Sequence, residues 1–316
     1  MRAQKLFEIV DLGPSETCII TELSDIRWLT GFSGSHAWLV VHHQELFLLT
    51  DGRYVEQARA EIEANRAVVE VIECRTLAAM QKATEKITQG ATSVQFQDSQ
   101  LTYQNFLALQ AELSSTLIPC DSLIKFLRRQ KDDIEIQLIE SACLIADHAL
   151  QQCVHLLSMG VTENDVRDEL EYAMRRLGAD GPSYDTIVAS GPTNSARPHH
   201  HPTGTKIENG HTVIIDVGAL VAGYHSDMTR SFVVGPMSSE QAEWYEAVRA
   251  AQQAGVEACR PGVQVSEIDA ACRRVLSQAG LEQYFTHGTG HGVGLLIHEE
   301  PFINSSGQAI LQPGDV

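Results

Sequence analysis

The 316-residue sequence predicts an α+β protein with two domains, an α/β domain over residues 1–125 and a second domain over residues 126–316. Three observations support this prediction. The length suits about two domains. Short β-type runs alternate with helical stretches in the first part of the chain, whereas long helices and strand-like runs typical of an antiparallel sheet occupy the second. The boundary is expected between residues 120 and 131, where one pattern replaces the other.

The first domain contains runs rich in β-branched and aromatic residues, which favour strands. These runs are TCIITEL, HAWLVVH, LFLLT, AVVEVIEC and TSVQF. Between them lie helical stretches at Arg53–Ala64 and Leu101–Leu113. This alternation predicts a sheet covered by helices.

The second domain opens with apolar residues spaced three and four apart, which is one face of a long helix ending at Gly160. They are Ile134, Leu138, Ala142, Ile145, Ala149, Cys153 and Leu156. Three more helices follow, of which Thr162 opens one and Gly280 closes another. These helices are expected at Glu163–Leu177, Ser239–Cys259 and Val265–Ala279, with strands at Tyr184–Ala189, Thr212–Leu220 and Thr229–Val234.

Composition and charge limit the partners of this protein. The formal net charge of −18 opposes binding to nucleic acid or anionic membranes, so peptides, small molecules or metal cations are expected instead. The N-terminal residues lack the apolar run of a secretory signal, and no stretch is long enough to span a bilayer. Seven scattered cysteines without a Cys-x-x-Cys pair suit reduced thiols, so a cytoplasmic location is expected.

Two aspartates flank a turn in the run VIIDVGALVAGYHSDMTRSF. If the chain reverses at Val221 and Ala222, Asp216 lies opposite Asp227 with the side chains about 5 Å apart. Like charges in that position destabilise a sheet, so the pair requires a cation, a shared proton or a different register.

Histidines form two groups. His199, His200 and His201 are consecutive, while the segment HGTGHGVGLLIHEEP holds three more among alternating glycines. Such a loop can bring an imidazole close to a ligand, although a surface loop with incidental histidines is the alternative. Two carboxylates and an imidazole together suit Mn²⁺, Co²⁺, Fe²⁺ or Zn²⁺. A metal is favoured over a shared proton because histidines and Arg230 are close in sequence.

The motifs PHHHP, VIID with SDMTR, and HGTGHGVGLLIHEEP, in this order, resemble the catalytic domain of the aminopeptidase P and prolidase family of metallopeptidases. The segments DIRWLTGFSGSHAWLVV and LLTDGRYVEQA resemble the creatinase-like N-terminal domain of Xaa-Pro peptidases. The resemblance implies a pita-bread fold and metal-dependent hydrolysis of the Xaa-Pro bond at peptide N-termini. It also implies two divalent ions, with Mn²⁺ favoured, peptide substrates with proline at the second position, and a homodimer.

The resemblance assigns roles to five residues. Asp216, Asp227 and His291 match metal ligands, with Asp227 bridging two ions. His199 matches a catalytic histidine that contacts the substrate and the developing oxyanion, and His298 matches a catalytic histidine near the proline-side pocket. Structural or solvent-exposed roles are expected for His200, His201 and His287.

The family has two further glutamate ligands on strands that follow the position where this sequence reads LQPGDV. Glu299 and Glu300 do not replace them, because they match a different family segment beside His298. The pita-bread domain of these 316 residues is therefore expected to lack its last strands, to bind metal weakly and to hydrolyse little. A methionine aminopeptidase-like enzyme and a non-catalytic peptide-binding relative are the alternatives, and the sequence does not distinguish an aminopeptidase from a dipeptidase.

Overall fold

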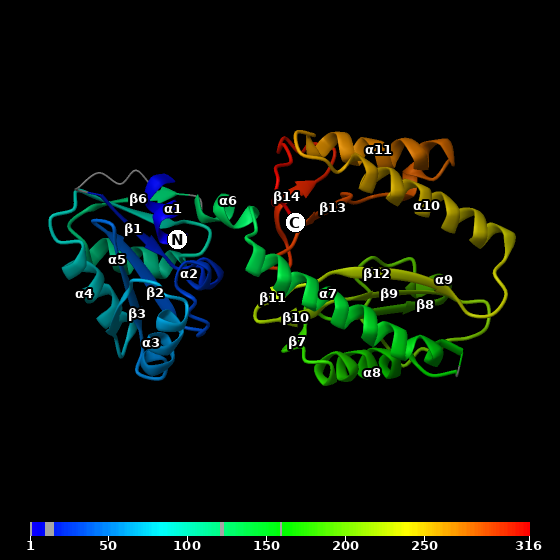
Figure 1. Cartoon of the computed structure of the whole chain (residues 1–316), viewed down its shortest axis with the longest axis horizontal. Helices are drawn as coiled ribbons and strands as arrows, with labels where there is room; N and C mark the ends of the chain where they lie inside the picture. Colours follow the sequence, from blue (N-terminus) through cyan, green and yellow to red (C-terminus); the bar gives the residue numbers. More distant parts are fainter. Residues whose placement is uncertain (1, 10–15, 121–122, 159) are drawn as a thin grey trace. The chain divides into compact units, whose positions relative to one another are not determined.

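The computed structural model describes residues 2–9, 16–120, 123–158 and 160–316 (Figure 1). The chain divides into two compact units, Met1–Arg128 and Arg129–Val316. The boundary region predicted from the sequence includes residues 121 and 122, which lie outside the described residues. No helix in the described ranges is long and apolar enough to cross a membrane.

The N-terminal unit is built on a six-stranded mixed sheet with the strand order β4-β3-β2-β1-β5-β6. In the centre of the sheet, β2 pairs antiparallel with both β1 and β3, and β1 pairs parallel with β5. The strands are β1 (Glu16–Ile20), β2 (Ala37–His42), β3 (Glu45–Thr50), β4 (Glu70–Glu73), β5 (Ser93–Gln97) and β6 (Thr116–Cys120). The expected alternation of strands and helices is confirmed.

Helices of this unit follow the strands as the sequence predicts, with small shifts at their starts. The helix predicted from Leu101 begins at Tyr103, because the Thr102 side chain accepts a hydrogen bond from the Asn105 N–H and so forms the N-cap. The helices are α1 (Arg2–Ile9), α2 (Leu23–Thr30), α3 (Val55–Ala64), α4 (Leu77–Ile87), α5 (Tyr103–Glu112) and α6 (Leu123–Arg129).

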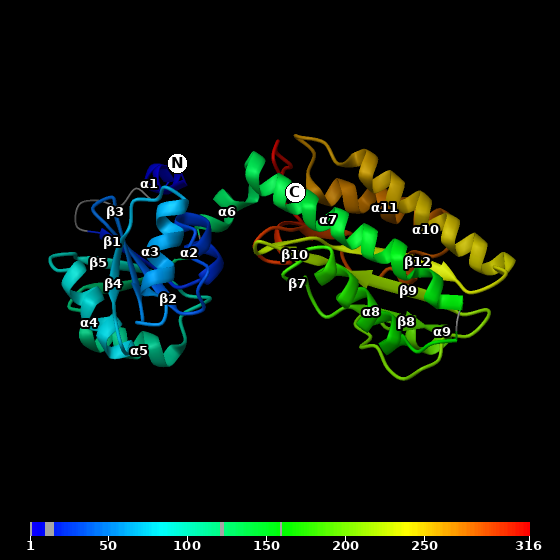
Figure 2. The same cartoon turned by 60° about the horizontal axis from the view of Figure 1, so that its bottom comes forward.

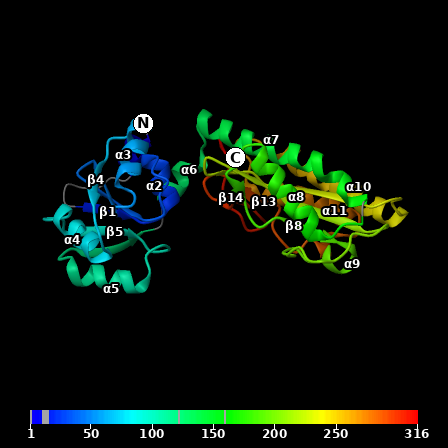
Figure 3. The same cartoon turned by 90° about the horizontal axis from the view of Figure 1, so that it is seen from below.

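Two helices form one layer of the second unit. Helix α7 (Asp133–Cys153) starts with a capping box, in which Asp132 and Glu135 each accept the other's backbone N–H at 2.9 Å. It continues as a 3₁₀ helix, Val154–Ser158, so the α-helix ends earlier than the predicted Gly160. Helix α8 (Glu163–Arg176) has the predicted N-cap and lies beside α7 (Figure 3).

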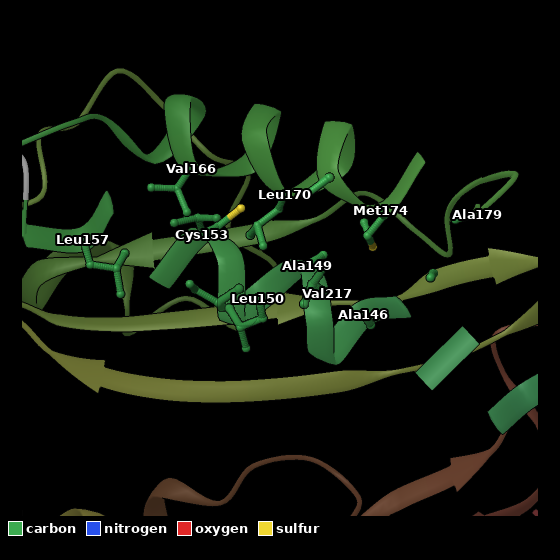
Figure 4. Packing of buried hydrophobic residues seen from close by; sticks show 14 of the residues in the cluster. Ala146, Ala149, Leu150, Cys153, Leu157, Val166, Leu170, Met174, Ala179 and Val217 are labelled. Atoms are coloured by element: carbon green, nitrogen blue, oxygen red, sulfur yellow. The ribbon is translucent and has the colours of Figure 1, made fainter. Parts of the chain in front are cut away.

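These helices cover a three-stranded antiparallel sheet of order β12-β9-β8, formed by β8 (Ile187–Ser190), β9 (Thr212–Val217) and β12 (Met228–Val233). Alternate residues of β9 are buried on the helix-covered face, so the intervening residues face the other way. Figure 4 shows side chains of α7, α8 and β9 meeting in this core. The predicted antiparallel sheet is confirmed.

A second small sheet extends the same hairpin. It contains β7 (Gly181–Pro182), β10 (Ala219–Val221) and β11 (Tyr224–His225). The strand predicted over Thr212–Leu220 is interrupted at Gly218, where an added Cβ would lie only 2.0 Å from the Ser226 carbonyl oxygen. Glycine is required at this point because the two backbones approach so closely.

The register of the hairpin differs from the prediction. The chain reverses at Ala222 and Gly223, which both have positive φ (47° and 80°), as in a two-residue type I′ turn. Asp216 therefore pairs with Thr229, not with Asp227. Side chains two residues apart along a strand share a face, so the two aspartates are diagonal neighbours on the face away from α7 and α8.

On the other side of these strands from α8 lie α10 (Ser239–Ala258) and α11 (Val265–Gln278) (Figures 1 and 2). Both match the predicted helices to within one residue. A 3₁₀ helix, Glu282–Tyr284, then leads into the two-stranded sheet of β13 (Gly290–Gly292) and β14 (Glu299–Ile303). The short helix α9 (Gly191–Asn194) follows β8.

Candidate metal centre

Asp216 and Asp227 converge on one tyrosine hydroxyl. The Tyr184 hydroxyl donates to Asp216 Oδ1 at 2.5 Å and lies 3.0 Å from Asp227 Oδ1. Asp216 is on β9, Asp227 directly precedes β12, and Tyr184 precedes β8. Three segments of the sheet thus bring the two carboxylates together despite the changed register.

The surroundings of Asp216 and Tyr184 disfavour the ionised forms of these two side chains. Burial raises the pKa of Asp216, the hydrogen bond from Tyr184 lowers it, and the negative charge of Asp227 raises it again, so that the pKa ends above its ordinary value. Burial and the two carboxylates also raise the pKa of Tyr184, which keeps its hydroxyl protonated as a donor. A cation would relieve the repulsion between the aspartates.

His291, on β13, lies beside the carboxylates with the ring orientation of a metal ligand. Its Nδ1 is 3.0 Å from the Gly292 carbonyl oxygen, which can only accept, so Nδ1 carries the proton. Nε2, the nitrogen left to bind a metal, lies 3.5 Å from Asp227 Oδ2. Histidine ligands in proteins usually donate their other N–H in this way.

These three side chains fit a divalent metal by their chemistry, because carboxylate oxygens and an imidazole nitrogen suit Mn²⁺, Co²⁺, Fe²⁺ and Zn²⁺. Across the part of the chain that the structure describes, no group of three or more His, Cys, Asp or Glu side chains is already arranged to hold an ion.

Both histidines expected to be catalytic lie near this cluster. The His298 ring packs edge to face on His291, with 4.4 Å between the ring centroids. His199 is exposed, and its charge acts on Asp216 to lower the pKa of that carboxyl. The structure thus places His298 against His291 and His199 within electrostatic reach of Asp216.

The neighbouring His200 has a structural role. It is buried, and its Nε2 lies 2.9 Å from Glu163 Oε2. Glu163, the first residue of α8, is fully buried and accepts six hydrogen bonds, from Ser190, Asn194, His200 and Thr203. Burial alone raises the pKa of Glu163, but these bonds outweigh it and lower the pKa to about 2.

This low pKa predicts acid-sensitive stability. The folded-state pKa of Glu163 lies below the ordinary value of 4.5, so its ionised form stabilises the fold above that pH, and the contribution is lost as the pH falls toward about 2. We expect Glu163→Gln to cost up to about 3 kcal/mol of unfolding free energy at pH 6, with a smaller difference at each lower pH. Urea unfolding from pH 6 to pH 3 measures this, with Glu169→Gln on the same helix as the control. A difference independent of pH would contradict it.

The glycine-histidine loop is held from α11. Arg273 donates to the carbonyl oxygen of His287 at 2.7 Å and to Asp269 at 2.7 Å, while Asp269 also accepts from Thr289 at 2.8 Å. The His287 ring is exposed and packs on Phe285. His287 therefore contributes its backbone to the loop anchor.

Sequence reasoning missed Tyr184 and Glu163. Tyr184 falls inside a strand-like run, and only the pairing of β8 with β9 places it beside Asp216. Glu163 looks like an ordinary acidic residue in a first helical turn, where negative charge is common. No local sequence pattern indicates that Glu163 is buried.

Comparison with known proteins agrees with this arrangement. The model of metallopeptidase family M24 matches residues 137–316, and the creatinase/prolidase N-terminal domain matches residues 2–130. The uncharacterized peptidase YqhT of Bacillus subtilis is 35% identical over 100% of this chain and 88% of its own length. An Xaa-Pro dipeptidase of Pyrococcus horikoshii is 32% identical over 100% of this chain and 87% of its own length.

A solved structure extends the likeness to the whole fold. The crystal structure of the prolidase from Pyrococcus horikoshii OT3 has a TM-score of 0.92 at 31% identity, and the match covers 99% of this chain and 88% of that one. The expected creatinase-like and pita-bread domains are thereby confirmed. This chain belongs to metallopeptidase family M24 and carries a creatinase/prolidase N-terminal domain.

Proposed function

We propose that this protein hydrolyses the Xaa-Pro bond at the N-terminus of peptides in a reaction that depends on divalent metal ions. The convergence of Asp216, Asp227 and His291 is the observation that carries the proposal. Relatives named Xaa-Pro dipeptidase and prolidase, similar over the whole chain, support the choice of substrate.

Asp216, Asp227 and His291 would hold the ions in this proposal, with Asp227 as the ligand that the family resemblance assigns to both. Divalent ions, when bound, lower the pKa of a water toward about 7 and so supply a nucleophile at neutral pH. Tyr184 keeps the two carboxylates aligned through its hydroxyl. His199 donates a hydrogen bond to the oxygen that becomes negative as the scissile carbonyl is attacked.

Proline determines the shape of the remaining site. The Xaa-Pro bond has no N–H, so the enzyme cannot recognise the bond through that donor and must recognise the ring by shape. His298 packs edge to face on His291 and presents its exposed ring beside the proposed ligands. We assign His298 to the proline-side wall of the site.

Hydrolysis assays on four peptides test the proposal. With Mn²⁺ present, and with the protein extended at its C-terminus to include the two glutamate ligands that the family resemblance implies, we expect release of alanine from Ala-Pro or from a tetrapeptide that begins Ala-Pro, and no cleavage of Ala-Ala. Cleavage of the dipeptide alone identifies a dipeptidase, and cleavage of both identifies an aminopeptidase. Cleavage of a Met-Ala peptide alone would favour a methionine aminopeptidase-like activity. Peptide binding without cleavage would favour a non-catalytic relative. Either result, cleavage of the Met-Ala peptide alone or binding without cleavage, would overturn the proposal.

We further propose Mn²⁺ as the metal, a homodimer as the assembly and the cytoplasm as the location. Mixed oxygen and nitrogen ligands favour Mn²⁺ over softer ions. All seven cysteines are free thiols, as a reducing compartment requires. Metal analysis of the purified protein and sedimentation equilibrium test the first two.

A further inference from the structure

We propose that Glu163 positions His199 for catalysis by fixing the loop that carries it, an inference that rests on the proposed function. Glu163 is a positioning residue, because none of its described contacts is with Asp216, Asp227 or His291. It acts through both ends of the segment from Ser190 to Thr203.

Each oxygen of the carboxylate holds one end of this loop. Oε1 accepts from the Ser190 N–H at 2.7 Å, from its hydroxyl at 2.9 Å and from Asn194 Nδ2 at 3.0 Å. Oε2 accepts from the Thr203 N–H at 3.0 Å, from its hydroxyl at 2.8 Å and from His200 Nε2 at 2.9 Å. One buried group therefore closes the loop at its start and at its end.

His199 lies between these two anchors. Its neighbour His200 is 5% exposed and bound to Glu163, whereas His199 itself is exposed. The loop follows β8, which pairs with β9 so that Ile187 lies opposite Asp216 and Ser190, where the loop starts, lies opposite Val213. The loop thus leaves the sheet three residues along β9 from Asp216, and the charge of His199 still acts on that carboxyl. The hydrogen bonds to Glu163 restrict where the His199 backbone can go.

Only an ionised carboxylate satisfies this set of donors. All six groups donate hydrogen bonds, so an amide in place of the carboxylate would keep one acceptor oxygen and turn an N–H₂ group toward three donors. The loop would lose half of its anchor while the helix stayed intact. A displacement of about 1 Å at a catalytic group can lower a rate about 10²-fold.

Steady-state kinetics with a double-mutant cycle tests the proposal. We expect Glu163→Gln to lower kcat on Ala-Pro about 10- to 100-fold, with KM changed less than about twofold. In a His199→Ala background the same substitution should lower kcat by no more than about twofold, because the group it positions is absent. The control Glu169→Gln, an exposed residue of the same helix, should keep wild-type kcat. An undiminished kcat in Glu163→Gln, or equal losses in both backgrounds, would overturn the proposal.

Two further measurements separate loss of the positioning role from misfolding of the variant and from failure of the proposed function. Ser190→Ala removes one donor and keeps the backbone N–H, so it should fold and show a smaller loss of kcat in the same direction. Histidine-selective NMR reports on His199 without any substrate: Glu163→Gln should shift or broaden the His199 ring signals and leave those of His42, in the N-terminal unit, unchanged. If the wild-type protein cleaves no Xaa-Pro peptide, the proposed function fails, and the NMR result alone decides the positioning role. Unchanged His199 signals would overturn it.

Discussion

Asp227→Ala should abolish Xaa-Pro hydrolysis, with a loss of at least about 10³-fold in kcat/KM. Asp227 is the side chain that contacts both Tyr184 and His291, so its removal takes a carboxylate from the centre of the cluster. Metal ions contribute several kcal/mol of transition-state stabilisation, and about 4 kcal/mol corresponds to about 10³-fold in rate. Assays on Ala-Pro at saturating Mn²⁺ measure the loss.

Metal binding by the same variant provides an independent measurement. Substitution of a single residue that only supports a ligand lowers metal affinity about 10- to 100-fold, so loss of Asp227, the proposed bridging ligand, should cost at least as much. Asp168→Ala is the matched control, because Asp168 is an exposed aspartate on α8 whose only described ion-pair partner is the adjacent Arg167. Wild-type affinity in Asp227→Ala would exclude the bridging role.

His199→Ala should lower kcat about 10²- to 10³-fold, the loss typical when one oxyanion donor is removed. The effect should fall on kcat, because the hydrogen bond strengthens only as charge develops on the carbonyl oxygen. His201→Ala provides the matched comparison: it is an exposed histidine two residues further along the same loop. A loss of equal size in both variants would point to the loop as a whole and exclude a specific role for His199.

The hairpin shows how much of the site the sequence could predict. The motif pattern identified Asp216, Asp227 and His291, although the assumed turn was displaced by one residue. Because side chains alternate with a period of two, the changed pairing moved Asp227 along the strand and left it on the same face. The correct turn had a signal in Gly223, since glycine favours the positive φ of the second turn position.

Supporting residues of the site depended on tertiary contacts that no local pattern contains. Glu163 is 27 residues from Ser190 and 40 from Thr203, and Tyr184 is 32 from Asp216. Periodicity predicted the helix and the strands that carry them, because burial repeats along each element. It could not predict which polar side chains meet between those elements.

The central claim, that a divalent ion binds between Asp216, Asp227 and His291, is tested most directly by a Mn²⁺ titration followed through histidine NMR. Paramagnetic Mn²⁺ broadens the ring signals of histidines near it. We expect His291 and then His298 to broaden at the lowest Mn²⁺ concentrations, His42 to stay sharp, and Asp227→Ala to remove the effect. Sharp His291 signals while Mn²⁺ binds elsewhere, or broadening that persists in Asp227→Ala and Asp216→Ala, would contradict a metal centre at this position.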